Sequence, residues 1–252
     1  MKHFLFSFIA AVFSLALFAQ NVECPKAVGG DGGQILVKTG FTVSYNHRTG
    51  CPDWVAWRLT KEHLEHPVTS RGDEFHEDAR ARKKVVYPRD YSNNGRHLDR
   101  GHMCPSADQV WSQEANDDSF LMTNICPQDH ALNEGLWLEL EQRCRTYAKM
   151  YGEVLVCCGP VWGKDVTSIA NGKILVPSAF FKVIASRDRL GKWHRLGFVF
   201  ENEPLDKSDD IFGYAVDVQE IEQTTGLVFF PEIKNAIEDP AERFWNIRWK
   251  KR

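Results

Sequence analysis

Positive charge is not in excess in this sequence of 252 residues: 31 Lys and Arg residues stand against 34 Asp and Glu residues, and the formal net charge is −3. The chain as a whole therefore lacks the basic field that marks many nucleic-acid-binding proteins. A local basic patch is still compatible with these numbers, because steering depends on the charge near a cleft. Hydrophobic residues make up 43% of the chain and charged residues 26%, which is typical of a folded globular protein.

Long apolar runs are missing beyond the N-terminus, so no later segment is expected to cross a membrane. Residues 1–20 combine Lys2 with an apolar stretch from Phe4 to Phe18 and small residues near Ala19. This pattern predicts a cleaved secretory signal peptide. The alternative is an uncleaved anchor, but the apolar run is shorter than the ~20 residues of a spanning helix. We therefore expect a soluble exported protein, secreted or periplasmic, with no stable membrane insertion after cleavage.

No Cys-x-x-Cys pair occurs in the chain, which argues against a structural zinc knuckle. An exported protein can form disulfides, but an odd number of cysteines leaves at least one thiol unpaired or intermolecular. The sequence leaves the pairing open. A looser set of residues, His102, Cys104, Cys126 and His130, is an alternative group of zinc ligands. The seven cysteines are Cys24, Cys51, Cys104, Cys126, Cys144, Cys157 and Cys158.

Internal repeats, low-complexity tracts and a convincing linker are also missing, which favours a single domain. Residues 21–39 are assigned to a leader, flexible up to residue 34, and residues 40–252 to the domain. The fold class is α+β, with a central, mostly antiparallel sheet. Strands are expected over residues 35–46, 54–60, 96–103, 120–125, 153–159, 173–186, 192–200 and 227–230, and helices over 106–118, 131–150 and 216–226.

Two of these helices have recognisable signals. Ser106 and Gln109 are spaced as a capping box at the start of the helix expected over residues 106–118. Leu136, Leu140 and Tyr147 supply the apolar face of the helix over residues 131–150, which also contains strong helix formers.

Polar residues that could perform chemistry cluster between residues 97 and 145. Each has an ordinary structural interpretation, as an interior histidine, a turn, a helix cap or an exposed ion pair. Positions 133, 137, 141 and 145 step by four, however, so they lie on adjacent faces of one helix. If the start of that helix faces the histidine, an amide oxygen suited to Mg²⁺ lies beside an imidazole base. The cluster comprises Asp99, Arg100, Gly101, His102, Asn124, Asn133, Glu141 and Arg145, with Trp137 expected in the core.

Several ordered motifs resemble the DNA/RNA non-specific endonucleases, the ββα-metal nuclease family of endonuclease G-like enzymes. The motif DRGH stands at residues 99–102, followed by MCPSAD, TNICPQ and LNEGLWLELEQRCR in the order and spacing of that family. The later stretches CCGPVW, VPSAFFKVI and VQEIEQTTGL are also similar. The likeness extends over roughly residues 40–235, and the combination is far more specific than DRGH alone.

The resemblance implies a ββα-metal active site and a role for each matching residue. His102 resembles the general base that takes a proton from water, and its neutral form is required. Asn133 matches the one direct protein ligand of a Mg²⁺ ion, which another divalent cation could replace. Glu141 matches the residue that holds metal-bound water, and Asn124 matches a supporting residue beside the base.

The resemblance also implies guanidinium groups at the phosphate. Arg100 and Arg145 match groups that steady the phosphate and its growing charge. Arg71 is the candidate for a further, upstream phosphate contact, with Arg80 and Arg82 as rivals. From the motif itself, we expect Asp99 to orient Arg100 and Gly101 to permit close backbone approach.

We therefore expect a Mg²⁺-dependent endonuclease that hydrolyses phosphodiester bonds of DNA and RNA with little sequence preference. The alternatives are a non-catalytic nucleic-acid-binding module of the same fold and a hydrolase of another phosphodiester. Cys104 and Cys126 flank the expected site, either as a disulfide or as two free thiols. The sequence leaves the oligomeric state open, a homodimer included.

Overall fold

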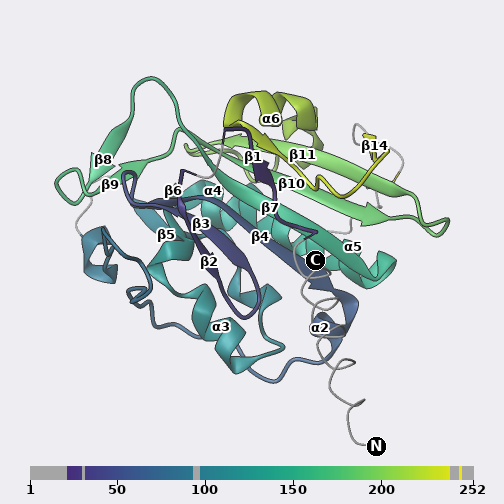
Figure 1. The fold of residues 1–252 in the computed structure, drawn as a ribbon, viewed down its shortest axis with the longest axis horizontal. Coiled ribbons are helices and arrows are strands. Elements are labelled where there is room, and N and C mark those ends of the chain that lie inside the picture. Colours follow the sequence, from purple (N-terminus) through teal and green to yellow (C-terminus); the bar gives the residue numbers. More distant parts are fainter. Residues whose placement is uncertain (1–21, 30–31, 93–96, 239–243, 246–252) are drawn as a thin grey trace, which may run out of the picture.

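The computed structural model describes residues 22–29, 32–92, 97–238 and 244–245. The predicted signal peptide, residues 1–20, lies outside this part of the chain. A single large sheet of eight strands runs through the molecule (Figure 1), and all of its pairings are antiparallel except the one between β11 and β14. In spatial order the strands are β12 (Ala215–Val216), β11 (Trp193–Glu201), β10 (Ala179–Arg187), β7 (Glu153–Val161), β4 (Cys51–Thr60), β3 (Thr42–Asn46) and β2 (Gln34–Val37), with β14 (Ile237–Glu238) beside β11. The expected α+β class is confirmed.

Three two-stranded sheets accompany the large one. The pair important for the site joins β5 (Leu98–His102) to β6 (Ile125–Asp129), with Gly101 opposite Cys126 and His102 opposite Ile125. The others join β1 (Lys26–Ala27) to β13 (Leu227–Val228) and β8 (Thr167–Ile169) to β9 (Ile174–Val176).

Helices cover both faces of the large sheet. The longest, α5 (Leu138–Tyr151), packs on β4, β7 and β10, whereas α6 (Val218–Thr225) packs on β11 (Figure 1). The shorter helices are α2 (Lys61–Glu65), α3 (Gln113–Ser119) and α4 (His130–Leu132). Single turns of 3-10 helix are η1 (Pro88–Tyr91), η2 (Ser106–Asp108), η3 (Met122–Asn124) and η5 (Ile211–Tyr214), and η4 (Asn133–Trp137) is a π-helical turn.

The large sheet separates two hydrophobic cores, because side chains alternate between its faces. In β10, Phe180 and Ile184 belong to the core beneath α5, whereas Phe181 and Val183 belong to the core beneath α6. Both faces are buried here, so the strand reads as a nearly continuous apolar run. Lys182 is the exception to that run and is as fully buried as its neighbours.

The expected leader, residues 21–39, is not separate from the domain. Lys26 and Ala27 pair with β13, and Gln34 to Val37 form an edge strand of the large sheet. Leu36 is buried in the main core, so burial of its side chain stabilises the packing of this segment on the domain. The assignment of a domain starting only at residue 40 therefore missed two strands.

Two further expectations differ from the structure. The helix expected over residues 106–118 is a single turn at Ser106–Asp108 followed by a separate helix, α3, whose first N–H groups are capped by Ser112 Oγ accepting from Ala115 N. The strand expected over residues 120–125 is the turn η3 leading into β6.

The helix expected over residues 131–150 is present as α4, η4 and α5, with Gly135 outside helical geometry at the kink. Within the described ranges, no helix is long and apolar enough to cross a membrane.

The start of α3 at Ser112 leads to a prediction about stability. Replacing Ser112 by Ala removes the cap of α3 and is expected to lower the free energy of unfolding by about 1 kcal/mol. Ser106→Ala is the matched control, because Ser106 is buried and its Oγ has no hydrogen-bond partner among the described atoms. Urea unfolding of both variants tests the assignment. An equal or larger loss of unfolding free energy in Ser106→Ala would contradict the cap at Ser112 and favour the helix start at Ser106 that the sequence predicted.

Candidate active site

Strands β5 and β6 and the helix that follows them form a compact ββα unit. His102 is the last residue of β5, and Asn133 opens the π-helical turn between α4 and α5. The turn contains a kink at Gly135, whose backbone is outside helical geometry. Asp129 caps α4 by accepting hydrogen bonds from Ala131 N and Leu132 N, so the helix begins directly after β6. The chain therefore brings the residues of the DRGH motif and Asn133 into one region.

Gly101 is required by the close packing of β5 against β6. A Cβ atom at this position would lie 2.6 Å from the Cβ of Gln128, which is itself fully buried. Real Cβ atoms do not approach so closely, so any side chain here would push β5 away from β6. The close approach expected at this glycine is present, and its immediate consequence is the position of His102 next to it.

His102 lies in an aromatic pocket. Its ring centroid is 5.2 Å from that of Phe75 and 5.0 Å from that of Phe120, and its Nε2 has no hydrogen-bond partner among the described residues. Burial, followed by the charges of Arg71 and Arg100, lowers the pKa of His102 to about 3. The imidazole is therefore neutral at physiological pH, as a proton acceptor must be.

Two contacts fix the backbone around His102. Asn124 is fully buried; its Oδ1 accepts from Cys104 N at 2.9 Å, and its Nδ2 donates to Cys104 O and Ser119 O, each at 2.8 Å. Trp137 Nε1 donates to His102 O at 3.3 Å from the helix side. Asn124 therefore acts on the turn after the histidine, since its amide is fully engaged by backbone groups.

Asp99 contacts Asn133 rather than Arg100, which corrects the expectation from the motif. Asn133 Nδ2 donates to Asp99 Oδ2 at 2.9 Å, and His130 Nδ1 lies 2.9 Å from the same oxygen. With its amide nitrogen held in this way, Asn133 keeps its Oδ1 as an acceptor. Asp99 and Asn133 both line an open pocket of about 380 Å³.

Two of the predicted arginines line the same pocket. Arg100 lies over the ring of Phe75, 4.3 Å from its centroid, and Arg71 lies 5.9 Å from the centroid of Phe120. The rivals for the upstream position lie elsewhere, because Arg80 NH1 donates to Val37 O and Arg82 N donates to Gln34 Oε1 on β2. Of the three upstream candidates, Arg71 is the one beside the histidine.

Glu141 and Arg145 belong to a buried charged network on α5. Arg145 NH1 lies 2.8 Å from Asp108 Oδ1 and 4.0 Å from Glu141 Oε2, and Trp57 Nε1 donates to Asp108 Oδ2 at 3.0 Å. Burial raises the pKa of Glu141 to about 7, against the opposing charges of Lys182 and Arg145. The exposed helix pair that was the ordinary interpretation of Glu141 and Arg145 is therefore wrong.

The alternative zinc set does not assemble. Cys104 Sγ accepts from Gln109 Nε2 at 3.1 Å, Cys126 shares a hydrogen bond with Cys51, and His130 is exposed beside Asp99. All seven cysteines are free thiols, so Cys104 and Cys126 are not joined. Over the described ranges, no group of three or more His, Cys, Asp or Glu side chains could hold a metal ion.

The donor set near Asn133 fits a hydrated hard cation. Asn133 lines a pocket whose other polar residues include Asp99 and Glu134. Mg²⁺ keeps several of its waters and needs few protein ligands, so one amide oxygen beside a wide, open pocket suits it. A zinc site would need at least three His, Cys or carboxylate ligands from the protein, and no such group occurs among the described residues.

Sequence reasoning missed several residues of this region. Asp108 was taken as part of a helix, and nothing in the local sequence marks it as the partner of Arg145. Phe75 and Phe120, which enclose His102, come from segments distant in the sequence. Lys182 did carry a signal, namely a charged residue in the middle of the apolar strand AFFKVIAS.

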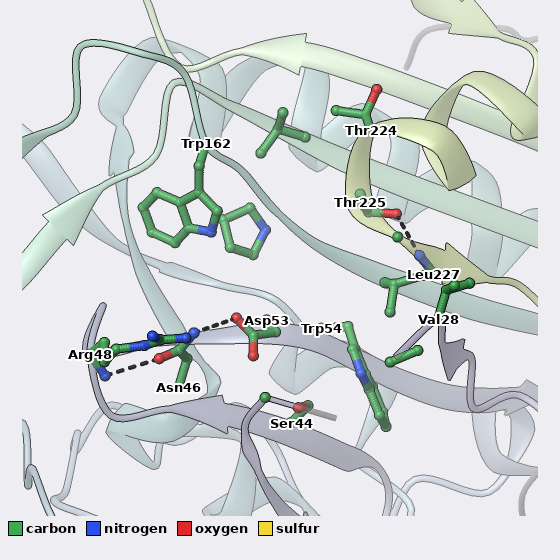
Figure 2. Close-up of a pocket in the computed structure, with 15 residues that line it drawn as sticks. Val28, Ser44, Asn46, Arg48, Asp53, Trp54, Trp162, Thr224, Thr225 and Leu227 are labelled. Carbon is green, nitrogen blue, oxygen red and sulfur yellow. Dashed lines mark hydrogen bonds between the residues drawn. The ribbon is translucent and has the colours of Figure 1, made fainter. Parts of the chain in front are cut away.

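A different pocket, of about 330 Å³, lies on the α6 side of the sheet. Figure 2 shows Trp54 and Trp162 at its walls and the Asn46–Asp53 hydrogen bond of 2.8 Å at its floor. None of the predicted site residues lines it. The chemistry expected from the sequence therefore concentrates on the α5 side, around His102.

Comparisons with known proteins agree with this geometry. The sequence profile described as DNA/RNA non-specific endonuclease matches residues 21–236. The chain is 31% identical over 214 residues to mitochondrial endonuclease G of Bos taurus, covering 79% of this chain and 70% of that protein. It is 32% identical over 222 residues to a nuclease of a Nostoc species, covering 82% of this chain and 78% of that protein. A solved structure of an EndoG/EndoGI complex shares the fold, with a TM-score of 0.75 and 24% identity over 85% of this chain and 94% of that one.

The buried pair of Asp108 and Arg145 generates the next prediction. Asp108→Ala would leave the guanidinium of Arg145, whose side chain is only 18% exposed, without its closest anion. We expect the free energy of unfolding to fall by about 3 kcal/mol, measured by urea denaturation. Glu65→Ala is the control, because its exposed i,i+4 pair with Lys61 is worth no more than about 0.5 kcal/mol. Similar losses in both variants would mean that the buried pair contributes no more than a surface one.

Proposed function

Because the chain belongs to the DNA/RNA non-specific endonuclease family, we propose that it is an exported, Mg²⁺-dependent endonuclease that cuts both DNA and RNA with little sequence preference. The chain is a nuclease, an enzyme that hydrolyses phosphodiester bonds. The observation that carries the finer proposal is a buried, neutral histidine beside an open pocket lined by two guanidinium groups and an amide oxygen.

His102 is the proposed general base. Water must lose a proton as it attacks phosphorus, and a neutral imidazole within reach can accept that proton on an unprotonated ring nitrogen. Burial among Phe75 and Phe120 supports this role, because it keeps the imidazole uncharged beside two arginines. Trp137 donates to the backbone carbonyl of His102 and Asn124 holds the turn at Cys104, which supports a fixed position for the base.

The arginines are proposed to bind the phosphate and its developing charge. Arg100 and Arg71 line the pocket, and planar guanidinium groups match phosphate oxygens with paired hydrogen bonds. Arg145 is proposed to stabilise charge from the helix side, where Asp108 fixes its orientation. Charge stabilisation of this kind is strongest in a partly enclosed site, where water does not screen it.

Asn133 would hold the Mg²⁺ ion through Oδ1, since Asp99 fixes the opposite end of its amide. A bound divalent cation supplies neutralisation of charge on the phosphate oxygens, and another divalent cation of similar size could serve. Glu141, buried two helical turns after Asn133, is proposed to orient water in the site by accepting hydrogen bonds. The proposed site thus combines oxygen atoms that suit Mg²⁺ and water with arginines that suit phosphate.

The proposed substrate range rests on the type of contact that the site offers, and the proposed location rests on the N-terminal sequence. Contacts to phosphate carry no base information, so a site built around arginines and a metal ligand would cut with little sequence preference. Export rests on the signal peptide proposed for residues 1–20, which predicts a secreted or periplasmic enzyme.

The base assignment is tested by His102→Ala. We expect kcat for supercoiled DNA and for RNA to fall by about 10²–10⁴-fold, because general-base catalysis contributes rate enhancements of that size. DNA binding, measured by fluorescence anisotropy in the presence of EDTA, should change little. His63→Ala is the control, since His63 stacks on Trp111 away from the pocket. Substantial cleavage by the His102 variant at neutral pH would refute the assignment, and cleavage unaffected by EDTA would refute the metal.

The pH profile gives an independent test. Burial raises the pKa of Glu141 to about 7, whereas burial and the neighbouring arginines lower the pKa of His102 to about 3. Cleavage should therefore decline as the pH falls through about 7, where Glu141 gains a proton and can no longer act as a pure acceptor, while His102 stays neutral. Initial rates at saturating Mg²⁺ measure the midpoint. A wild-type midpoint below about pH 5 would assign the acidic limb to a group other than Glu141.

A further inference from the structure

Lys182 occupies an unusual position for a lysine. It lies in the middle of β10, on the face that packs against α5, and its side chain has no solvent exposure. Its Nζ has no hydrogen-bond partner among the described residues. A buried ammonium group without hydrogen bonds is costly unless an opposite charge lies close to it.

The surroundings of the Lys182 ammonium are mostly apolar. Its Nζ lies 3.9 Å from the ring centroid of Trp137 and 5.8 Å from that of Trp57, and both indoles are buried. The ring faces attract a cation, but cation–π attraction does not replace a counter-charge. Lys182 also acts electrostatically on the buried thiols of Cys144 and Cys158. Burial raises the pKa of both thiols to about 12, so neither is an anion that could balance Lys182.

Glu141 is the carboxyl group in the right place. It follows Trp137 by one helical turn, on the same face of α5, and it is buried. Lys182 exerts the strongest opposing charge on Glu141, ahead of Arg145. The other buried carboxylate nearby, Asp108, is already bonded to Arg145 and Trp57.

We propose that Lys182 is the buried counter-charge of Glu141 and acts as a positioning residue that keeps Glu141 ionised for the proposed hydrolysis. The inference rests on the proposed function for its catalytic meaning, although the pairing of the two charges is a property of the folded chain alone. Lys182 has no solvent exposure, so its proposed effect on the site is indirect. It acts through Glu141, and its contact with Trp137 supports the indole that donates to His102 O.

Four charged groups act most strongly on Glu141. Lys182 approaches from β10, Arg145 from α5 itself and Arg71 from the segment after α2, and Asp108 is the opposing anion on η2. Arg145 is shared with Asp108, and Arg71 lines the open pocket. Loss of Lys182 therefore leaves Glu141 without a cation of its own.

The first experiment measures stability and needs no activity. In the folded protein the pKa of Glu141 lies above its ordinary value, so its stabilising contribution is present at low pH and is lost as the pH rises through the folded pKa. Lys182→Met should raise that pKa further and extend the loss to higher pH. The destabilisation caused by Lys182→Met should therefore be larger at about pH 9 than at about pH 6, measured as the shift in urea midpoint.

A matched control separates charge from packing. Phe180 lies two residues before Lys182 on the same face of β10, is fully buried, and its ring centroid is 5.6 Å from that of Trp137. Phe180→Leu disturbs the same contact without removing a charge, so its destabilisation should not grow between about pH 6 and pH 9. Parallel pH dependence in the two variants would overturn the proposed pairing.

A double variant covers the case in which Lys182→Met does not fold. Lys182→Met combined with Glu141→Gln removes both charges, and replacing both members of a buried pair is tolerated better than removing one. The double variant should fold, and Lys182→Met should cost less in the Glu141→Gln background than alone. Equal cost in both backgrounds would overturn the pairing, whether or not the chain is a Mg²⁺ enzyme.

The second experiment addresses the catalytic role. Lys182→Met should move the acidic limb of the cleavage profile upward by about one to three pH units, because a nearby opposite charge lowers a carboxyl pKa by that much. Lys182→Arg, which restores the charge, should return the limb toward the wild-type position, and Phe180→Leu should leave it in place. An unmoved limb in an active Lys182→Met variant, together with a confirmed pairing, would overturn the positioning role alone. Wild-type protein without nuclease activity would instead refute the proposed function.

Discussion

Helix α5 packs on the large sheet across a layer of buried charge, and the site depends on how that charge is compensated. Lys182 comes from β10, Glu141 and Arg145 from α5, and Asp108 from the turn η2. Each of these groups would be costly to bury alone, but together they form two opposite pairs in a buried layer between the helix and the sheet. The orientation of α5 over the sheet is therefore restricted by more than apolar packing, because a shift of the helix would separate charges as well as expose side chains.

The packing of α5 also restricts the backbone of β5, the strand that ends at His102. Trp137 contacts Lys182 of the charged layer through its ring and donates a hydrogen bond to His102 O at the end of β5. On the other side of the histidine, Asn124 fixes the turn, and Gly101 allows β5 to lie against Gln128. The backbone around His102 is thus held at three points, while Phe75 and Phe120 enclose the imidazole and burial keeps it neutral. Asn133, at the kink of the same helix, faces the open pocket, so the inner network and the outer pocket meet at one helix start.

The sequence was most informative where chemistry and local geometry coincide. The DRGH motif, the position of Asn133 after it and the four-residue steps to Glu141 and Arg145 are all local, and the structure brings Arg71, Arg100, His102 and Asn133 to one region. The roles of individual members were harder to predict. Asp99 binds Asn133 and His130 instead of Arg100, and the helix start at Ser106 is a single turn, because both outcomes depend on partners distant in the sequence.

By itself the sequence determined the class of fold, the order of the motifs and the residue types of the site, because alternation, helical spacing and short motifs are properties of neighbouring residues. It could also establish that Glu141 and Arg145 share a helix face. Only the tertiary structure decided that this face is buried, that Asp108 and Lys182 supply the opposite charges, and that two phenylalanines from separate segments enclose His102. The physical reason is that burial and counter-charge are set by which segments meet in space, and those segments are far apart along the chain.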